Sequence, residues 1–404
     1  MSGTSLDGVD AALVRIGGPD RPRLRLLAFT TLPYPAAVRL RLLRVAGGEA
    51  VPAGEVSDLN FLLGDLFAAA ALRVCHEGRV APKRLSAIGS HGQTIFHQGR
   101  SRPPVGEGRP TAGREVTSRR QLASTLQIAE PAIIAAKTGV PVVADFRTAD
   151  MAEGGEGAPL VPLVDYLVLR DAKHNIIALN IGGIANVTVI PAGGEAEEVF
   201  GFDTGPGNMV MDGLVRHFTR GRQNYDLDGR VSAQGKVMEG LLGDLLRLTF
   251  FKRQPPKSAG REQFGRAFLE RHFLSRRGAG FKDLLRTATE LTARSIAAAL
   301  QRFVFPRLTL QTGSDRLVVS GGGAHNRLLL ARLRELLPQL DARLSDEYGL
   351  PADAKEAMAF AVLADRTLHR LTGNLPAVTG ARRPVVLGKI VFGSQFSVLR
   401  ERPW

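Results

Sequence analysis

Alternating and continuous apolar residues in the first part of the chain predict two strands followed by two helices. The strands cover Val9–Ile16 and Leu24–Tyr34, where apolar and β-branched residues dominate. Apolar residues then recur at helical spacing over Ala36–Val45 and Ser57–His76. The Ser-Asp pair that opens the second helix is suited to cap it. The chain therefore begins with a strand hairpin and two helices.

The next part of the pattern mixes short strands, short helices and one polar insertion. Leu85–Ser90 and Val140–Phe146 are predicted as buried strands, and Ala132–Thr138 and Leu160–Leu169 as helices. Residues 98–124 are rich in Gly, Pro, Arg and Ser and show no apolar periodicity. We expect this stretch to form a surface insertion.

Two β-like runs lie within Asn180–Asp212, and each ends in a Gly-dense turn. The second turn contains one carboxylate, Asp203, beside the hydroxyl of Thr204. Downstream, one buried strand is predicted at Leu317–Ser320. The remaining pattern predicts helices over Met211–Thr219, Ser232–Leu246, Glu262–Phe273, Asp283–Phe303, Asn326–Leu337 and Ala354–Leu371. This order of elements is typical of an α/β fold.

The first turn of the chain, Ser2–Asp10, leads directly into a strand. A polar, Gly-containing turn of this kind normally joins two strands, and no strand precedes it in this sequence. We therefore expect the first strand of the sheet to be missing here, either because it is absent or because the start codon was placed late.

Composition adds limits on the partners of this protein. The 404 residues are 44% hydrophobic and 23% charged, with a formal net charge of +14 and a pI near 10.6. The arginines are dispersed and only 6% of residues are aromatic, so platforms on which bases could stack are scarce. A weak attraction for anionic substrates is a better explanation of the charge than a nucleic-acid partner.

Cysteine usage and hydropathy point to the cytoplasm. Cys75 is the single cysteine, so an intrachain disulfide is impossible. Apolar runs such as Leu66–Leu72 are too short to span a bilayer. The N-terminus, MSGTSLDG, has neither the basic nor the apolar region of a signal peptide. We expect a cytoplasmic protein without a membrane partner.

Common nucleotide and metal motifs are missing from the sequence. It contains no GxxxxGK[ST], no GxGxxG after a strand, no HExxH and no CxxC. Three Gly-rich turns at strand ends offer another kind of phosphate site: SGTSLDGVD, NIGGIANVT and VVSGGGAHN. Closely spaced backbone N–H groups in such turns suit phosphate oxygens, and the last turn opens a helix.

Taken in order, nine segments resemble the anhydro-N-acetylmuramic acid kinase family, part of the sugar kinase, heat-shock 70 and actin superfamily. They run from Ser2 to about Gly380, nearly the whole chain. The segments are SGTSLDGVD, GSHGQT, ADFR, GGEGAPLVP, NIGGIANVT, GFDTGPGNMVMD, PPKSAGRE, SGGGAHN and EAMAFA. A chance match of nine ordered motifs is not a credible explanation.

The resemblance implies a two-domain, actin-like (ribonuclease H-like) α/β fold with ATP in an interdomain cleft. One domain would comprise residues 1–160 and 366–404, the other 161–365. Asp7 or Asp10 would hold Mg²⁺ near the phosphates, although either carboxylate could instead cap the turn. The ATP-binding residues implied are Gly3, Thr4, Ser5, Leu6, Asp7, Gly8, Val9, Asp10, Gly182, Gly183, Asn186, Gly321, Gly322 and Gly323.

The family's catalytic base would be Asp203, which would activate water to open a 1,6-anhydro bond while O6 accepts the γ-phosphoryl group of ATP. His91, Gln93, Arg147 and Glu356 would line the sugar side, with Arg147 suited to a lactyl carboxylate. Structural roles compete with each assignment: a loop cap for Asp203, a packed histidine for His91 and a helix N-terminal charge for Glu356. The family also implies a homodimer and a place in peptidoglycan recycling.

Three departures separate this chain from the family pattern: the missing first strand, the long basic stretch at 98–124, and LQIAEP in place of LQIG. Two rival hypotheses therefore stay open. The first is a kinase of another anhydrosugar, such as levoglucosan, or a plain sugar kinase. The second is a non-catalytic sugar sensor or nucleic-acid-associated protein that retained the fold.

Overall fold

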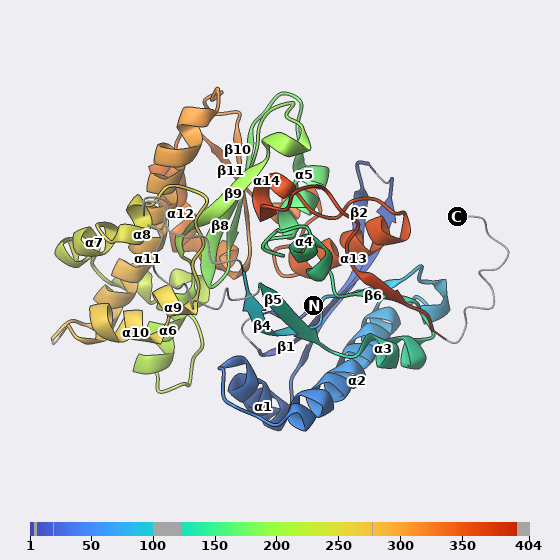
Figure 1. Cartoon of the computed structure of the whole chain (residues 1–404). Helices are drawn as coiled ribbons and strands as arrows, with labels where there is room; N and C mark the ends of the chain where they lie inside the picture. Colours follow the sequence, from blue (N-terminus) through green and yellow to red (C-terminus); the bar gives the residue numbers. More distant parts are fainter. Residues whose placement is uncertain (4–5, 19, 100–122, 277, 394–404) are drawn as a thin grey trace, which may run out of the picture. The chain divides into compact units, whose positions relative to one another are not determined.

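The computed structural model describes residues 1–3, 6–18, 20–99, 123–276 and 278–393 (Figure 1). The chain forms two compact units: unit 1 comprises Met1–Val164 with Glu356–Trp404, and unit 2 comprises Asp165–Lys355. The first boundary lies after residue 164, four residues later than the expected residue 160. The second lies at residue 356, ten residues before the expected residue 366. The second differs because helix α13 (Lys355–Leu368) packs within unit 1, where its Phe360 contacts the ring of Phe146.

Unit 1 opens with a long antiparallel hairpin. Strands β1 (Gly8–Gly17) and β2 (Arg23–Pro33) pair along their length, with a bulge between Leu13 and Val14. Helices α1 (Ala36–Ala46) and α2 (Ala53–Glu77) follow, as predicted. Helix α2 begins earlier than expected, directly after Pro52, whose fixed φ suits a helix start. The predicted Ser-Asp cap is therefore wrong, because those two residues lie inside the helix.

The remaining strands of unit 1 form two small sheets. In one, β3 (Ile88–Ser90) runs parallel to β6 (Val142–Ala144), which pairs antiparallel with β12 (Lys389–Val391). In the other, β4 (Gln93–Gln98) and β5 (Ser124–Ile128) form a hairpin. The expected insertion at 98–124 joins these two strands, and most of it lies outside the described residues. The short helices of the unit are α3 (Pro131–Thr138), α4 (Thr148–Ala152) and α14 (Pro376–Thr379).

Helix α2 is the one described helix that is long and apolar enough to cross a membrane, judged by length and composition. Within the structure it is a core helix. Its buried Leu59, Leu63 and Phe67 belong to the apolar cluster that also contains Val9, Leu42 and Ile134. Packing of this kind accounts for the apolar face that α2 turns toward the core.

Unit 2 is built on a five-stranded mixed sheet in the order β11-β10-β7-β8-β9. Strands β11 (Asp341–Leu344), β10 (Arg316–Ser320) and β7 (Ile176–Ile181) are parallel to one another. Strands β8 (Ile184–Ile190) and β9 (Phe200–Pro206) add two antiparallel neighbours. The α/β class predicted from the sequence is therefore confirmed.

One face of this sheet carries the core of unit 2. Helices α6 (Met209–Phe218), α11 (Phe281–Ala299) and α12 (Arg327–Leu336) bury apolar side chains there (Figure 1). Helix α5 (Val161–Leu169) was predicted correctly and carries the chain into unit 2. Four shorter helices complete the set: α7 (Glu239–Leu246), α8 (Thr249–Lys252), α9 (Arg261–Phe264) and α10 (Arg266–Leu269).

Two predicted helices are broken by glycine. Ser232–Leu246 was expected to be one helix, but only α7 is α-helical, and a single 3-10 turn covers Ser232–Gln234. A Cβ on Gly235 would lie 2.0 Å from the carbonyl oxygen of Lys282, so the chain passes too close to α11 for a helix to continue. Gly265 likewise separates α9 from α10.

A buried ion pair lies where the chain crosses from one unit to the other. The Nζ atom of Lys355 is 2.8 Å from Oδ1 of Asp165 and donates a hydrogen bond to Oγ of Ser320 at 3.1 Å. The side chains of Lys355 and Asp165 are 6% and 5% exposed. Burial raises the pKa of Asp165, an effect that Lys355 opposes. The carboxylate therefore depends on Lys355 for its charge.

We predict that Lys355→Met destabilises the protein by about 3 kcal/mol, because it leaves Asp165 buried without a counter-charge. The double variant Asp165→Leu/Lys355→Met should lose much less, since it removes both charges. Urea unfolding followed by circular dichroism measures the difference. Arg343→Met, which breaks an exposed pair with Asp341, is the control and should change little. Equal losses in the single and double variants would contradict the ion-pair explanation.

Candidate functional site

The Gly-rich turns of unit 2 are joined to one another by short backbone contacts. Gly182 and Gly183 form the turn between β7 and β8, and their carbonyl oxygens accept hydrogen bonds from Asn208 N at 2.7 Å and Gly207 N at 2.9 Å. A Cβ on Gly207 would lie 2.2 Å from the oxygen of Gly182. The two turns can approach this closely only because glycine occupies position 207.

The third turn, which follows β10, packs against the same place. Gly321 has a φ of +79°, and a Cβ there would lie 2.6 Å from Oδ1 of Asn180. A Cβ on Gly323 would lie 2.3 Å from the side chain of Ile181. Gly322 faces the side chain of Asn208. The structure thus brings together the two glycine sets that the sequence predicted for ATP in this unit, Gly182–Gly183 and Gly321–Gly323.

A row of polar side chains crosses three neighbouring strands next to these turns. Asn180 of β7 is paired with Asn186 of β8, which is paired with Asp203 of β9. Directly paired residues point to the same face of a sheet, and the alternate residues Leu179, Val187 and Phe202 point into the core. Asn180 and Asn186 therefore lie on the same face as the predicted base, on the two strands that lead to the turn.

The carboxyl group of Asp203 is held by the loop that precedes α9. The backbone N–H of Asp203 donates to the carbonyl oxygen of Lys257 at 3.0 Å, and the Oδ2 atom of Asp203 accepts from the N–H of Ala259 at 2.8 Å. Burial raises the pKa of Asp203 to about 6, although the bond from Ala259 and the charge of Lys257 lower it. A carboxylate with this pKa is ionised at neutral pH and takes up a proton more readily than an ordinary aspartate.

Lys257 is a buried cation close to this carboxylate. The residue is 5% exposed, and its Nζ donates to the carbonyl oxygen of Phe250 at 3.3 Å. Its ammonium lies 4.7, 5.0 and 5.8 Å from the ring centres of Phe250, Phe303 and Phe202. Burial lowers the pKa of Lys257 to about 8, so it is mostly charged at neutral pH.

In unit 1, His91 and Arg147 form a pair. The Nε of Arg147 donates to Nε2 of His91 at 3.1 Å, and its Nη1 donates to the oxygen of Gly157 at 2.7 Å. Because Nε2 accepts from an arginine, Nδ1 carries the ring proton and donates to the oxygen of Gly92 at 3.0 Å. Burial and then the charge of Arg147 hold the pKa of His91 well below its usual range, so His91 is neutral.

Burial lowers the pKa of Arg147 to about 10, and the negative charges of Glu356 and Asp150 oppose this effect. The guanidinium therefore stays charged at neutral pH and keeps part of its donor capacity beyond His91 and Gly157. Glu356, the fourth residue predicted on the sugar side, is an exposed carboxylate in the first turn of α13. His91, Arg147 and Glu356 thus belong to one neighbourhood of unit 1.

The side chain of Gln93 forms hydrogen bonds to the first turn of the chain. Its Oε1 accepts from Oγ of Ser2 at 2.6 Å, and its Nε2 donates to the oxygens of Gly3 and Thr94 at 3.3 and 3.2 Å. The residue is 1% exposed. In this structure the side chain of Gln93 positions Ser2 and Gly3, which is a different task from the sugar contact expected for it.

The other residues predicted for the first turn divide into three groups. Leu6 and Val9 are buried in the core, and Gly8 pairs with Pro33, so any ligand contact from these three would use the backbone. Thr4 and Ser5 lie outside the described residues. Of the two candidates for Mg²⁺, Asp7 is exposed, whereas Asp10 accepts a hydrogen bond from Thr31 at 2.7 Å. Among the described residues no cluster of three or more His, Cys, Asp or Glu could hold a metal.

Sequence reasoning missed three residues that lie beside these groups: Asn180, Asn208 and Lys257. Asn180 and Asn208 stand beside the glycines in motifs that were singled out, so their position was a usable signal. Lys257 lies 54 positions from Asp203, and only the fold brings the two together. Asp212, in the first turn of α6, has its pKa raised to about 7 by burial.

Comparison with known proteins gave one family model, described as anhydro-N-acetylmuramic acid kinase, which matches residues 1–107 and 111–393. A relative of that name from Gloeobacter violaceus is 45% identical over 391 residues, covering 96% of this chain and 97% of its own. A second, from Caldanaerobacter subterraneus subsp. tengcongensis, is 42% identical over 395 residues, covering 96% and 95%. A third, from Clostridioides difficile, is 40% identical over 392 residues, covering 96% of each.

Two solved structures show weaker likeness. Component A of (R)-2-hydroxyglutaryl-CoA dehydratase from Acidaminococcus fermentans is 10% identical, covers 88% of this chain and 96% of its own, and has a TM-score of 0.37. A ROK hexokinase from Thermus thermophilus is 16% identical, covers 87% and 98%, and has a TM-score of 0.29. Likenesses this weak carry no argument about the site.

We predict that Asp203→Asn stabilises the protein at pH 8 but not at pH 4. Because burial raises the pKa of Asp203 from 3.8 to about 6, folding favours the protonated form. The resulting cost is absent well below pH 3.8, grows as the pH rises and is complete above 6, where it is on the order of 3 kcal/mol. Urea unfolding of both proteins at the two pH values measures it. A gain of the same size at both would show that the charge of Asp203 is not responsible.

We also predict that Lys257→Met raises the pKa of Asp203 further, because it removes the nearby positive charge that lowers it. Carbon-13 titration of aspartate-labelled protein, with the Asp203 signal assigned by Asp203→Asn, measures the shift. Methionine should fit among the rings of Phe202, Phe250 and Phe303. The control is Lys252→Met, which removes an exposed charge on α8. An unchanged Asp203 titration in Lys257→Met would mean that the two groups are not coupled.

Proposed function

Because the chain belongs to the anhydro-N-acetylmuramic acid kinase family, we propose that it opens 1,6-anhydro-N-acetylmuramic acid with water and phosphorylates the released O6 from ATP. The product is N-acetylmuramic acid 6-phosphate. The observation that best supports this proposal is the carboxyl group of Asp203, half-buried beside the Gly-rich turns with its pKa raised to about 6.

Asp203 acts as the general base in this proposal. Its carboxylate takes a proton from water, the water oxygen bonds to the anomeric carbon, and the bond from that carbon to O6 breaks. O6 then attacks the γ-phosphorus of ATP, and ADP leaves. General-base assistance of this kind is typically worth about 10²–10⁴ in rate. The bond from Ala259 fixes Oδ2 in place, which orients the other carboxyl oxygen.

The glycine turns supply the phosphate side of the proposed site. The set comprises Gly182, Gly183, Gly321, Gly322 and Gly323. The absence of a Cβ at Gly321 and Gly323 lets the turns pack closely, and closely spaced backbone N–H groups in such turns suit phosphate oxygens. Asn186 completes the set in unit 2, and the phosphate contacts of Gly3 in unit 1 stay a prediction. The donor types fit Mg²⁺ bound to phosphate oxygens and one carboxylate, Asp7 or Asp10, and the ion would supply charge neutralisation during phosphoryl transfer.

The sugar side of the proposal rests on unit 1. Arg147 stays charged, its orientation is fixed by His91 and Gly157, and it retains N–H groups for a lactyl carboxylate. The neutral His91 can only be a positioning group, because its Nε2 accepts from Arg147 and its Nδ1 donates to Gly92. Gln93 acts indirectly, by holding Ser2 and Gly3.

The cellular setting follows from the substrate. An anhydro-muramic acid derives from peptidoglycan, so we place the reaction in cell-wall recycling and amino-sugar catabolism, in the cytoplasm where ATP is available. Cys75, the single cysteine, is buried. A homodimer without nucleic-acid or membrane partners stays a prediction, which light scattering and a DNA-binding assay at physiological salt can check.

The assay that tests the proposal offers ATP and Mg²⁺ with three sugars in parallel: 1,6-anhydro-N-acetylmuramic acid, levoglucosan and glucosamine. We expect ADP release with the first alone. In H₂¹⁸O, the label should enter the anomeric hydroxyl and not the phosphate ester. Turnover of levoglucosan alone would favour the other anhydrosugar kinase, and no turnover with DNA binding would favour the sensor.

In the same assay we predict that Asp203→Asn lowers kcat by at least about 10²-fold, because the general base is lost. Its affinity for ATP, measured by calorimetry, should stay within a factor of about two. Asp244→Asn removes an exposed carboxylate paired with Arg247 and serves as the control. Retained turnover in Asp203→Asn would remove Asp203 from the mechanism.

A further inference from the structure

One carboxyl group of unit 1 is fully buried and is assigned no part in the reaction proposed above. Asp150, in the first turn of α4, is 0% exposed. Its Oδ1 atom accepts hydrogen bonds from Nδ2 of Asn374 and from Oγ1 of Thr379, both at 2.6 Å. Its Oδ2 atom accepts from the N–H of Gly157 at 2.8 Å. A buried carboxyl group surrounded by three donors is held in one orientation.

Because all three partners of Asp150 donate, the position suits a carboxylate and not an amide. Oδ1 of Asn374 accepts from the N–H of Val385 at 2.8 Å, which turns Nδ2 of Asn374 toward Asp150. The backbone N–H of Gly157 can only donate. An amide at position 150 that kept the bonds from Asn374 and Thr379 would therefore turn its own N–H toward the N–H of Gly157. Exchange of the carboxylate for an amide breaks the bond from Gly157.

The loop that contains Gly157 wraps closely around Asp150. It is the glycine-rich start of the segment GGEGAPLVP, residues 154–162. A Cβ on Gly155 would lie 2.1 Å from Oδ2 of Asp150. Gly157 has a φ of +67°, and a Cβ there would lie 2.7 Å from Cγ of Met151. Glycine is needed at both positions because the loop approaches Asp150 and its neighbour this closely.

Gly157 connects Asp150 to the guanidinium of Arg147. The N–H of Gly157 donates to Asp150, and its carbonyl oxygen accepts from Nη1 of Arg147 at 2.7 Å. On its other side the guanidinium contacts Nε2 of His91, with Nε at 3.1 Å and Nη2 at 2.8 Å. The ring of His91 packs on that of Phe360 in α13, with 4.5 Å between ring centres. Two contacts thus orient Arg147, and one of them depends on Asp150.

A guanidinium held on two sides keeps its remaining N–H groups for a ligand. Of its five N–H groups, the contacts with His91 and Gly157 use three within the described part of the chain. The planar group recognises a carboxylate through two parallel hydrogen bonds, which form only when its plane is correctly oriented. Asp150 itself cannot touch such a ligand, because it is fully buried. Its effect on binding can pass only through the residues that it holds.

We propose that Asp150 is a positioning residue that acts through Gly157 on Arg147, and thereby sets the preference of the site for a sugar that carries a carboxylate. This role rests on the proposed function, in which Arg147 receives the lactyl carboxylate. It goes further by assigning the preference to a residue that touches no substrate. The sugars to compare are 1,6-anhydro-N-acetylmuramic acid and 1,6-anhydro-N-acetylglucosamine, which has a hydroxyl in place of the lactyl ether.

The first test measures the binding of both sugars to the whole protein by calorimetry, without ATP. In Asp150→Asn we expect the affinity for the anhydromuramic acid to fall by about 10-fold, the effect of one lost charge-assisted contact. The affinity for the anhydroglucosamine should change by less than about two-fold, because it has no carboxylate. In the kinase assay KM should rise while kcat changes little, since Asp203 and the glycine turns lie in unit 2.

Thr379→Val is the matched control for this test. It removes a buried bond to Asp150 but leaves the bond from Gly157, so the preference between the two sugars should persist. An equal loss of affinity for both sugars in Asp150→Asn would show that Asp150 only supports the fold. The same loss of preference in Thr379→Val would also contradict the path through Gly157.

A second readout follows Arg147 without any ligand. Nitrogen-15 shifts of the His91 ring report whether Nε2 accepts a hydrogen bond, and Arg147→Met gives the shifts of a ring without this contact. In Asp150→Asn the shifts should move toward those of Arg147→Met. Unchanged shifts would mean that Asp150 does not act on Arg147. A wild-type protein that bound neither sugar would refute the proposed function, and the His91 shifts would then decide alone whether Asp150 orients Arg147.

Gly157→Ala reaches the same contact with Asp150 intact, which matters if Asp150→Asn does not fold. The new Cβ would meet Met151, so the loop must shift relative to Arg147. We expect the same loss of preference and the same change in the His91 shifts. Gly48→Ala is the control, because Gly48 also has a left-handed backbone, with a φ of +83°, but has open space around it. Wild-type preference and shifts in a folded Gly157→Ala would refute the proposal.

Discussion

Close backbone approach between three turns is the constraint on which the site in unit 2 depends. Gly207 lies so near Gly182 that a Cβ would stand 2.2 Å from its oxygen, and Gly321 and Gly323 approach Asn180 and Ile181 in the same way. These contacts fix where β7, β9 and β10 end relative to one another. Asp203 stands four residues before Gly207, so its position is set by the same contacts. A larger side chain at any of these glycines would separate the turns and displace the polar row beside them.

The pKa of Asp203 is set by two opposing effects, burial and stabilisation of the charge by neighbouring groups. Burial raises its pKa, whereas the N–H of Ala259 and the charge of Lys257 lower it, and the balance lies near 6. With less burial the group would be a weak base, and with less compensation it would be protonated at neutral pH. Folding bears the cost of the ionised form, which is the relation between stability and activity expected for the general base proposed above. Lys257 is buried among aromatic rings. Because these rings exclude water, the charge of Lys257 acts more strongly on its neighbours than it would in solvent.

Local patterns in the sequence predicted most elements but not their interruptions. The hairpin β1–β2, helix α5 and helix α13 were close to their predicted bounds, because each has strong apolar periodicity. The predicted helix over Ser232–Leu246 was wrong because the contact of Gly235 with Lys282 is non-local. The strands β11 and β12 have only four and three residues, too few for an alternating pattern to show, and they depend on neighbours for pairing. The ordered motifs located the glycines and Asp203. The proximity of Lys257 to Asp203 and the hydrogen bond between Ser2 and Gln93 could be seen only in the structure.

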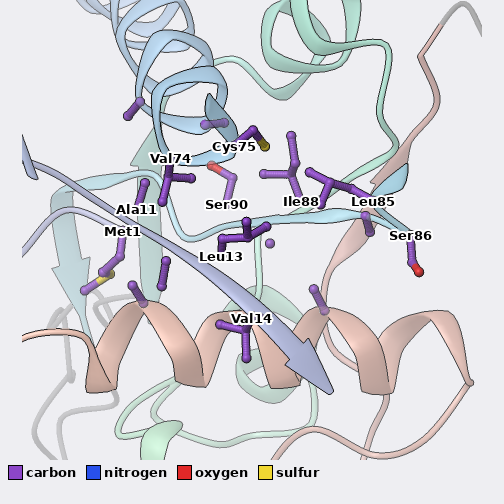
Figure 2. A pocket seen from close by; sticks show the side chains of 18 of the residues that line it. Met1, Ala11, Leu13, Val14, Val74, Cys75, Leu85, Ser86, Ile88 and Ser90 are labelled. Atoms are coloured by element: carbon purple, nitrogen blue, oxygen red, sulfur yellow. The ribbon is translucent and has the colours of Figure 1, made fainter. Parts of the chain in front are cut away.

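The same limit explains why a pocket in unit 1, lined by residues of β1, β3, α2 and α13, is invisible in the sequence (Figure 2). The alanines of α2 and α13 are good helix formers and look unremarkable within each helix. Only when the fold sets the two helices on opposite sides of a gap do their small side chains define a space. The first turn is held at the border of this space, because Ser2 donates to Gln93 and the backbone of Met1 pairs with that of Asp10. A turn anchored at the border of a pocket has fewer packing contacts than one anchored inside a closed sheet, and segments of this kind open at a lower free energy than the core.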